Sequence, residues 1–206
     1  MSDLHQRQAG VLLHVTSLPG PNGIGDFGPD AFRFVDWLAC AGQKIWQWLP
    51  TTPIGPGDSP YQSVSAFAGS PLMVALEPLV SSGWLAPPQA PDGGFDALRV
   101  DFAHVVPWRQ QQLRMAFQGF TAKNSMIEQQ AFAEWRAQEA SWLDDYTLFM
   151  ALETENDGKA WWHWPDAVCR READALVAAR ARLADEIGFW AFVQWCFDTQ
   201  LAVLKH

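Results

Sequence analysis

The chain has 206 residues, 49% of them hydrophobic, and a formal net charge of -9. This length and apolar content are enough for one hydrophobic core of ordinary size, or for part of a larger one. The 14 basic residues are scattered along an acidic chain. We therefore expect no nucleic-acid partner, because capture of a phosphate backbone needs massed positive charge.

The three cysteines, Cys40, Cys169 and Cys196, are widely spaced and odd in number. This spacing gives neither a disulfide framework nor a zinc-ligand pattern, so we expect buried thiols in a reducing compartment and no metal site. The first residues, MSDLHQRQAG, have no signal-peptide apolar region, and no apolar run reaches membrane-spanning length. These observations predict a cytoplasmic protein with no membrane partner.

The first 71 residues have the pattern of strand, loop, helix, strand and loop. Two apolar runs of strand length, GVLLHV at residues 10–15 and KIWQWL at residues 44–49, flank a helical pattern. The apolar positions of this helix follow i, i+3, i+4, i+7 spacing at Ala31, Phe34, Val35 and Leu38, with Pro29 suited to its first turn. The pattern predicts a βαβ unit with parallel strands buried on both sides.

The stretch GIGDFG, residues 23–28, fits the letters of the dinucleotide-binding fingerprint G-x-G-x-x-G. In that fingerprint the first glycine ends the strand, whereas seven residues separate Val15 from Gly23 here. Asp26 would repel a phosphate, and Pro29 removes an N–H group from the start of the helix. The sequence therefore favours a glycine-shaped turn with Asp26 bonded to neighbouring backbone, and no nucleotide cofactor.

Beyond residue 71 the patterns are helical. A turn-rich connector covers residues 81–94, and Asp101 is placed to cap the helix that follows it. One face of that helix carries Val106, Gln110, Leu113, Phe117 and Phe120. Capping patterns predict helices starting after Ser125, with Glu128 three residues on, and after Ser141, and the last helix is predicted from Ala184 to Leu204.

Several segments together resemble the N-terminal part of the 4-α-glucanotransferases, the family of amylomaltases or disproportionating enzymes. The segments SLPG, GIGDFG, FVDWLA, WQWLP and, above all, SPYQSVSAFAG at residues 59–69 occur in the order and spacing of that family. DYTLFMAL at residues 145–152, WWHWP at residues 161–165 and the Trp- and Phe-rich last helix agree with it.

The resemblance implies an α/β fold that begins a (β/α)8 barrel. The two apolar runs would be its first two strands within residues 1–71, and residues 72–206 would be a large, mainly helical insertion. Loops 16–28 and 50–71 follow the two strands, so they would lie on the catalytic face, where the carboxyl ends of barrel strands meet.

The resemblance also implies an activity: the transfer of α-1,4-glucan segments to acceptor sugars by a retaining route through a covalent glycosyl-enzyme. Tyr61 would stack on the donor sugar ring and Ser59 would hydrogen-bond one of its hydroxyls, with a maltooligosaccharide or α-glucan as substrate and no cofactor. The alternative for Tyr61 is a structural role, buried against Pro60 and Phe67. Pro56 stands where many relatives have a tyrosine of a secondary glucan site, so that site is not expected, and Ser70 replaces a usual asparagine.

The catalytic carboxylates of the family belong to later strands, so we expect none in this chain. Asp26 and Asp58 are read as turn formers, and His14 as a hydrogen-bonded strand histidine rather than a base. The chain would then be an inactive N-terminal fragment whose uncovered strands are mobile or pair with another copy. The alternative is a non-catalytic helical module that serves in binding or assembly.

Overall fold

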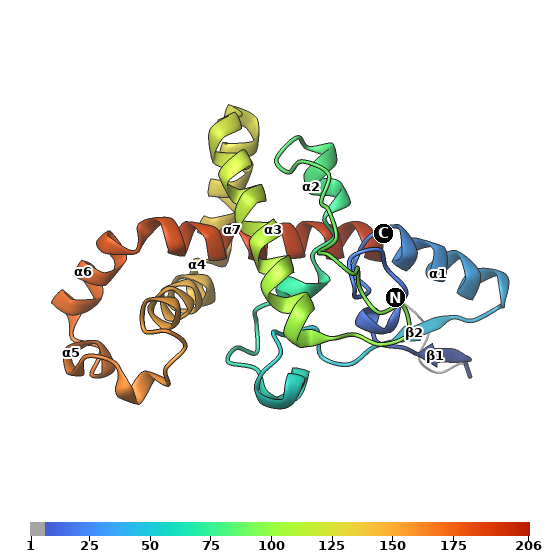
Figure 1. Ribbon diagram of the computed structural model, residues 1–206, viewed down its shortest axis with the longest axis horizontal. Coiled ribbons are helices and arrows are strands. Elements are labelled where there is room, and N and C mark those ends of the chain that lie inside the picture. Colours follow the sequence, from blue (N-terminus) through green and yellow to red (C-terminus); the bar gives the residue numbers. More distant parts are fainter. Residues whose placement is uncertain (1–6) are drawn as a thin grey trace. The chain divides into compact units, whose positions relative to one another are not determined.

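The computed structural model describes residues 7–206 (Figure 1). Its strands are β1 (Gly10–Leu12) and β2 (Ile45–Gln47). Its helices are α1 (Pro29–Cys40), α2 (Glu77–Ser81), α3 (Phe102–Lys123), α4 (Met126–Glu155), α5 (Asp166–Cys169), α6 (Ala173–Arg182) and α7 (Ala184–Lys205). Short 3-10 turns are η1 (Val15–Ser17), η2 (Pro56–Asp58), η3 (Pro60–Gln62), η4 (Pro71–Met73) and η5 (Trp161–His163).

The chain divides into two compact units. The first unit extends through Lys123 and includes Cys196–His206, and the second unit is Asn124–Trp195. Helix α7 thus has residues in both units. This division does not coincide with the sequence boundary at residues 71 and 72, which remains a prediction about a barrel and its insertion.

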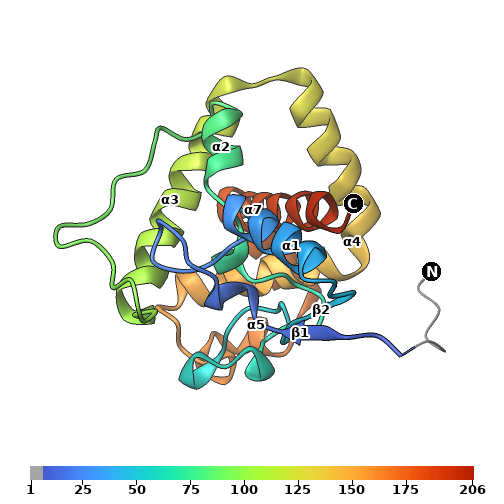
Figure 2. The ribbon, with the colours of Figure 1, turned by 90° about the vertical axis from the view of Figure 1, so that its right-hand side faces the viewer.

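The two strands of the first unit, labelled in Figure 2, pair in parallel, as the βαβ pattern predicts. Gly10 lies opposite Ile45, and Leu12 lies opposite Gln47. They are three residues long, shorter than the apolar runs that contain them. The strands are uncovered, as expected for runs patterned for burial in a larger sheet that this chain does not complete: Leu12 is 59% exposed and Ile45 is 43% exposed. Within residues 7–206 the sheet has only these two strands, so no neighbouring strand covers their outer edges.

Helix α1 confirms the helical pattern between the strands. Pro29 occupies its first turn and Asp30 adds a negative charge near the amino end of the helix dipole. Ala31 and Leu38 are buried on its inner face. The helix ends at Cys40 and is followed by Gly42, whose φ of 72° is a left-handed conformation that glycine adopts without steric cost.

Helix α3 begins directly after Asp101, as predicted. The backbone carbonyl of Asp101 accepts a hydrogen bond from the Val105 N–H at 2.8 Å. A hydrogen bond with His104, together with nearby backbone N–H groups, lowers the pKa of the Asp101 carboxyl. Val105 packs with Ile24 and Leu72 in a small apolar cluster. Helix α3 therefore packs against Ile24, which precedes α1 in the sequence, and against Leu72, which follows it.

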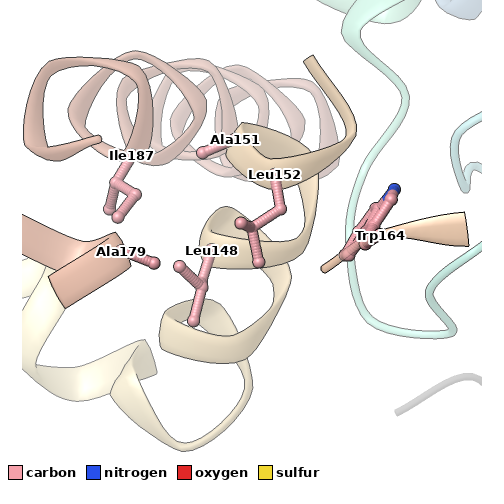
Figure 3. Packing of buried hydrophobic residues seen from close by; sticks show 6 residues of the cluster. All are labelled: Leu148, Ala151, Leu152, Trp164, Ala179 and Ile187. Carbon is pink, nitrogen blue, oxygen red and sulfur yellow. The ribbon is translucent and has the colours of Figure 1, made fainter. Parts of the chain in front are cut away.

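The second unit is helical and has its own apolar cluster. Its helix α4 begins at a predicted cap, where the Ser125 Oγ accepts the Glu128 N–H at 3.5 Å. The predicted start after Ser141 is wrong, because α4 runs without interruption through that residue. The intervening residues RAQEA contain no glycine or proline that would end a helix. The cluster is shown in Figure 3 and consists of Leu148, Ala151, Leu152, Trp164, Ala179 and Ile187.

The predicted last helix is confirmed as α7. Within residues 7–206, it is the one helix that is long and apolar enough to cross a membrane, judged by length and composition alone. By this test, the expectation that no apolar run reaches membrane-spanning length is wrong. This observation is weak evidence for a span, because 56% of the apolar stretch is buried in the structure and core helices pass the same test.

The cysteines differ in their surroundings. Cys196 in α7 is buried, as expected, and burial raises the pKa of its thiol. Cys169 is partly buried, whereas Cys40 is exposed, which contradicts the expectation of three buried thiols. Cys40 lies on the outer side of the last turn of α1, where no other element covers it in the described chain.

Candidate functional site

The loop after β2, residues 50–71, is closed by hydrogen bonds rather than by helices or strands. The Ser70 N–H donates to the Thr51 carbonyl at 2.7 Å, which joins its two ends. Within the loop, Gly55 N–H donates to the Ser59 carbonyl at 2.9 Å. A Cβ at Gly55 would lie 1.9 Å from the Gln62 carbonyl oxygen, so this close approach of backbone requires glycine.

Ser59 precedes the short turn η3 and caps it. Its Oγ accepts the Tyr61 N–H at 3.3 Å, and the Thr52 hydroxyl donates to the Pro60 carbonyl at 2.8 Å. A hydroxyl that accepts one hydrogen bond can still donate its own proton. Ser59 is only half-buried, so a ligand at the loop surface can reach it.

Tyr61 is 69% exposed. The structural alternative, a tyrosine buried against Pro60 and Phe67, is therefore wrong, and Phe67 is itself exposed. The reason is the position of Tyr61 in η3, whose backbone is held by Ser59 while the ring extends away from the loop. The loop thus presents an aromatic face to solvent on a fixed backbone.

Serine hydroxyls fix the rest of the SPYQSVSAFAG segment. The Ser65 Oγ accepts the N–H groups of Phe67 and Ala68 at 3.2 and 3.1 Å, and the Ser63 Oγ accepts the Ser65 N–H at 3.3 Å. Such side-chain bonds replace the backbone bonds that a helix or strand would supply. The segment therefore folds locally through hydrogen bonds between its serine hydroxyls and neighbouring backbone N–H groups.

The two glycine-containing segments of the candidate site meet at one ring. A Cβ on Gly69 would lie 2.2 Å from the ring of Phe197 in α7, so the backbone at Gly69 lies directly against that ring. Phe27, from GIGDFG, packs on the same ring at a centroid distance of 5.2 Å. The Phe27 N–H also donates to the Met73 carbonyl at 3.0 Å. The loop after β1 is therefore joined to the loop after β2.

Asp26 confirms its predicted role in the turn, since its Oδ1 accepts the Gly28 N–H at 2.9 Å. It has a second role that the sequence did not reveal. Its Oδ2 accepts a hydrogen bond at 3.0 Å from Arg109, a fully buried residue of α3 that also donates to the Val74 carbonyl. Burial raises the pKa of Asp26, Arg109 opposes this effect, and the carboxylate of Glu77 adds to it. Asp26 is thus a buried anchor of the loop.

A cavity of about 570 Å³ lies beside the loop after β1. One wall consists of backbone and side chains from Thr16 to Ile24, and the other of residues from Asp96 to Phe102. Polar groups such as Thr16, Ser17 and Arg99 share it with apolar ones. Its size and mixed lining are those of a small-molecule site.

Asp58 and His14, the other residues considered from the sequence as possible catalytic groups, have separate surroundings. Asp58 is exposed and has a left-handed φ of 57°, as a turn residue does. His14 follows β1 instead of lying within it, and its buried Nδ1 has no hydrogen-bond partner among the described residues, so the expectation of a hydrogen-bonded strand histidine is wrong for that atom. Burial lowers the pKa of His14. Within residues 7–206, no three His, Cys, Asp or Glu side chains gather as metal ligands.

Comparison with known proteins identifies relatives for almost the entire chain. A family model described as 4-alpha-glucanotransferase matches residues 13–206. A 4-alpha-glucanotransferase of Thermus thermophilus is 47% identical over 199 residues, and one of Synechocystis is 40% identical over 195 residues. These alignments cover 97% and 93% of this chain.

The fold has a close counterpart among solved structures. The amylomaltase from Streptococcus agalactiae in complex with acarbose superimposes with a TM-score of 0.91 and 37% sequence identity, over 97% of this chain and 40% of that one. The alignments cover 39% of the Thermus protein and 38% of the Synechocystis protein. The chain therefore spans about two fifths of the length of the relatives it matches.

Proposed function

The chain belongs to the 4-α-glucanotransferase family, and from that premise we propose that it supplies the donor-glucan-binding part of an enzyme that moves α-1,4-glucan segments onto acceptor sugars. The proposal is supported by the match over nearly the whole chain and by the acarbose bound to the Streptococcus agalactiae amylomaltase. The proposed substrate is a maltooligosaccharide or a longer α-glucan.

In this proposal β1 and β2 are the first two strands of a (β/α)8 barrel, and residues 72–206 are a helical insertion. The parallel pairing of the strands and the connection through α1 agree with the start of such a barrel. The loops after the two strands would then lie on the catalytic face. Their joining through Phe27, Gly69 and Phe197 is the support for treating them as one face.

The proposed chemistry at this face is recognition of a neutral sugar. A pyranose has a C–H face that packs on an aromatic ring and hydroxyls that need hydrogen-bond partners. Tyr61 offers an exposed ring, and Ser59 lies two residues away with a hydroxyl that can donate. The single observation that carries the proposal is the exposure of Tyr61 on a loop whose backbone is held by hydrogen bonds.

The reaction itself would use carboxylates contributed from outside these 206 residues. A retaining mechanism needs a nucleophile and an acid/base about 5 Å apart across one glycosidic bond. Asp26 is committed to Gly28 and Arg109 and is buried. We therefore propose that the chain binds and orients the donor sugar, and that a longer protein containing it performs the transfer.

The test uses that longer protein, with kcat/KM for maltotriose disproportionation as the readout. Replacing Tyr61 with alanine should lower kcat/KM by about 5- to 150-fold, which corresponds to about 1–3 kcal/mol of transition-state stabilisation. The matched control is Tyr61→Phe, which keeps the ring and should retain most of the activity. An unchanged kcat/KM in Tyr61→Ala would remove Tyr61 from the site.

The placement of the catalytic groups has its own test. The 206-residue chain alone, incubated with maltotriose, should yield neither glucose nor longer maltooligosaccharides. Either product, in a preparation free of host enzyme, would overturn the proposal that the catalytic carboxylates lie outside these 206 residues. Absence of transfer by the longer protein would favour the alternative of a non-catalytic binding or assembly module.

A further inference from the structure

The helical unit Asn124–Trp195 contains a cavity of its own, of about 380 Å³. Its floor is apolar and includes Leu148 of α4, Val168 of α5 and Leu176 of α6. At its mouth it is lined by Trp161, Asp145 and Arg171. A volume of this size is within the range of about 300–1,000 Å³ that small-molecule sites span, and an apolar lining with a few polar groups is their usual composition.

Trp161 is held in place through its backbone while its ring remains accessible. Its carbonyl oxygen lies 2.8 Å from the thiol of Cys169, which is also 3.2 Å from the carbonyl of Trp164. The indole N–H of Trp164 in turn donates to the Lys159 carbonyl at 2.8 Å. Trp161 is nevertheless 51% exposed. A fixed backbone and an open ring are the requirements of an aromatic binding surface.

The polar groups at the mouth form an ion pair. The Arg171 Nη2 lies 2.9 Å from both carboxylate oxygens of Asp145, and Arg180 approaches the same carboxylate at 3.5 Å. Both side chains of the main pair are more than half exposed. The carboxylate has further lone pairs and the guanidinium further N–H groups, so the pair can accept from and donate to the same ligand.

We propose that this cavity is a second binding site for α-glucan, in which a glucose unit lies with its C–H face on Trp161 and the apolar floor and its hydroxyl edge toward Asp145 and Arg171. A pyranose ring has this same division between an apolar face and a polar edge. The proposal rests on the proposed function only for the choice of glucan as the ligand. The site is distinct from Ser59 and Tyr61, which belong to the other compact unit.

The chain offers a matched control for Trp161. Trp162 is the adjacent residue, is 63% exposed, and does not line the cavity. Its ring lies edge-on to that of Trp161 at a centroid distance of 5.8 Å. Because both indoles are at the surface of the same turn, either alanine substitution alters the protein surface to a similar extent, but only one removes a wall of the cavity.

The experiment is a titration of the 206-residue chain with maltotetraose, followed through the indole N–H signals in ¹⁵N-correlated spectra. The chain carries Tyr61→Ala so that binding at the first site does not contribute. We expect the largest shift at the Trp161 indole. Trp161→Ala should weaken binding by about tenfold or more, whereas Trp162→Ala should change it by less than about threefold. Asp145→Asn, which removes the charge and preserves the shape, should also weaken it.

Binding that is unaffected by Trp161→Ala and Asp145→Asn, or the absence of any maltotetraose-dependent shift, would overturn the inference. The inference would also be overturned if no sugar binds and the molecular mass of the protein rises with its concentration, provided that Trp161→Ala abolishes this rise. In that case a second copy of the protein, and not a sugar, would occupy the cavity. The outcome is independent of transfer by the longer protein. Sugar binding at Trp161 in a protein without transferase activity would support this site and overturn the proposed function alone.

Discussion

The loop of residues 50–71 and the helical unit Asn124–Trp195 are stabilised in different ways. In the loop, serine hydroxyls and close backbone approaches at Gly55 and Gly69 fix the chain, and the aromatic ring of Tyr61 is left outside. In the helical unit, large apolar side chains such as Leu148 are buried in a cluster. A segment held by polar bonds can therefore expose its aromatic residues to a ligand, because its stability does not depend on burying them.

This difference predicts where each region is vulnerable. The first unit should be most sensitive at a few polar anchors and glycines, and the second at its buried apolar residues.

The largest effect is expected at Arg109, which anchors the loop after β1 through Asp26 and Val74. Arg109→Met should lower the free energy of unfolding by about 3–5 kcal/mol, because it leaves the Asp26 carboxylate buried without its partner. Denaturant unfolding measures this. The double variant Asp26→Leu, Arg109→Met removes both charges and should be more stable than Arg109→Met alone. If the single and double variants lose the same stability, the pair is not the anchor.

In the helical unit, Leu148→Ala should cost about 2–5 kcal/mol, because the side chain is almost fully buried in the cluster of Figure 3 and its removal leaves a cavity. The control is Val177→Ala in α6, where the side chain is 67% exposed, with an expected loss of less than about 0.5 kcal/mol. Equal losses for the two variants, measured by urea unfolding, would contradict a packed core at Leu148.

Gly69→Ala tests the loop by steric conflict alone, since the backbone at Gly69 is not in the left-handed region. The new Cβ would overlap the Phe197 ring, so we expect a loss of about 1–3 kcal/mol in the free energy of unfolding. Adding Phe197→Leu should recover part of the loss by making room. A Gly69→Ala protein as stable as the wild type would show that the ring moves aside freely.

The smallest expected effect concerns His14. Burial lowers its pKa in the folded chain below the ordinary value of 6.5, so as the pH falls below that value the unfolded state binds the proton more readily and stability is lost. The free energy of unfolding should therefore decline between about pH 7.5 and about pH 5.5 more steeply in the wild type than in His14→Asn. Parallel pH profiles for the two proteins would contradict a shifted histidine.

Local patterns in the sequence were sufficient for much of the fold. Proline at the start of α1 and the Ser125 cap of α4 each act within one turn, and the structure has both, as it has the predicted last helix α7. The break expected at Ser141 failed because a capping residue is only a possible helix start. Without a helix-terminating residue before it, the chain continued through Ser141.

Contacts between distant residues could not be predicted in this way. Arg109 is 83 residues from Asp26, and an arginine in a helical pattern gives no sign that it will be buried. The contact of Gly69 with Phe197 likewise joins segments that are far apart in the sequence. The family resemblance pointed to Ser59 and Tyr61, and their stacking and hydrogen-bonding roles remain a prediction, while the exposure of Tyr61 is a finding of the structure.

The most direct test of the account is a crystal structure of the longer, transfer-competent protein with maltotetraose bound. We predict that the Tyr61 ring lies parallel to a glucose ring at van der Waals distance, about 3.5–4 Å, and that the Ser59 Oγ lies within hydrogen-bond distance of a hydroxyl of the sugar. The loop of residues 50–71 should keep the conformation described above. A donor sugar bound elsewhere on the barrel, with Tyr61 in contact only with solvent, would contradict the account.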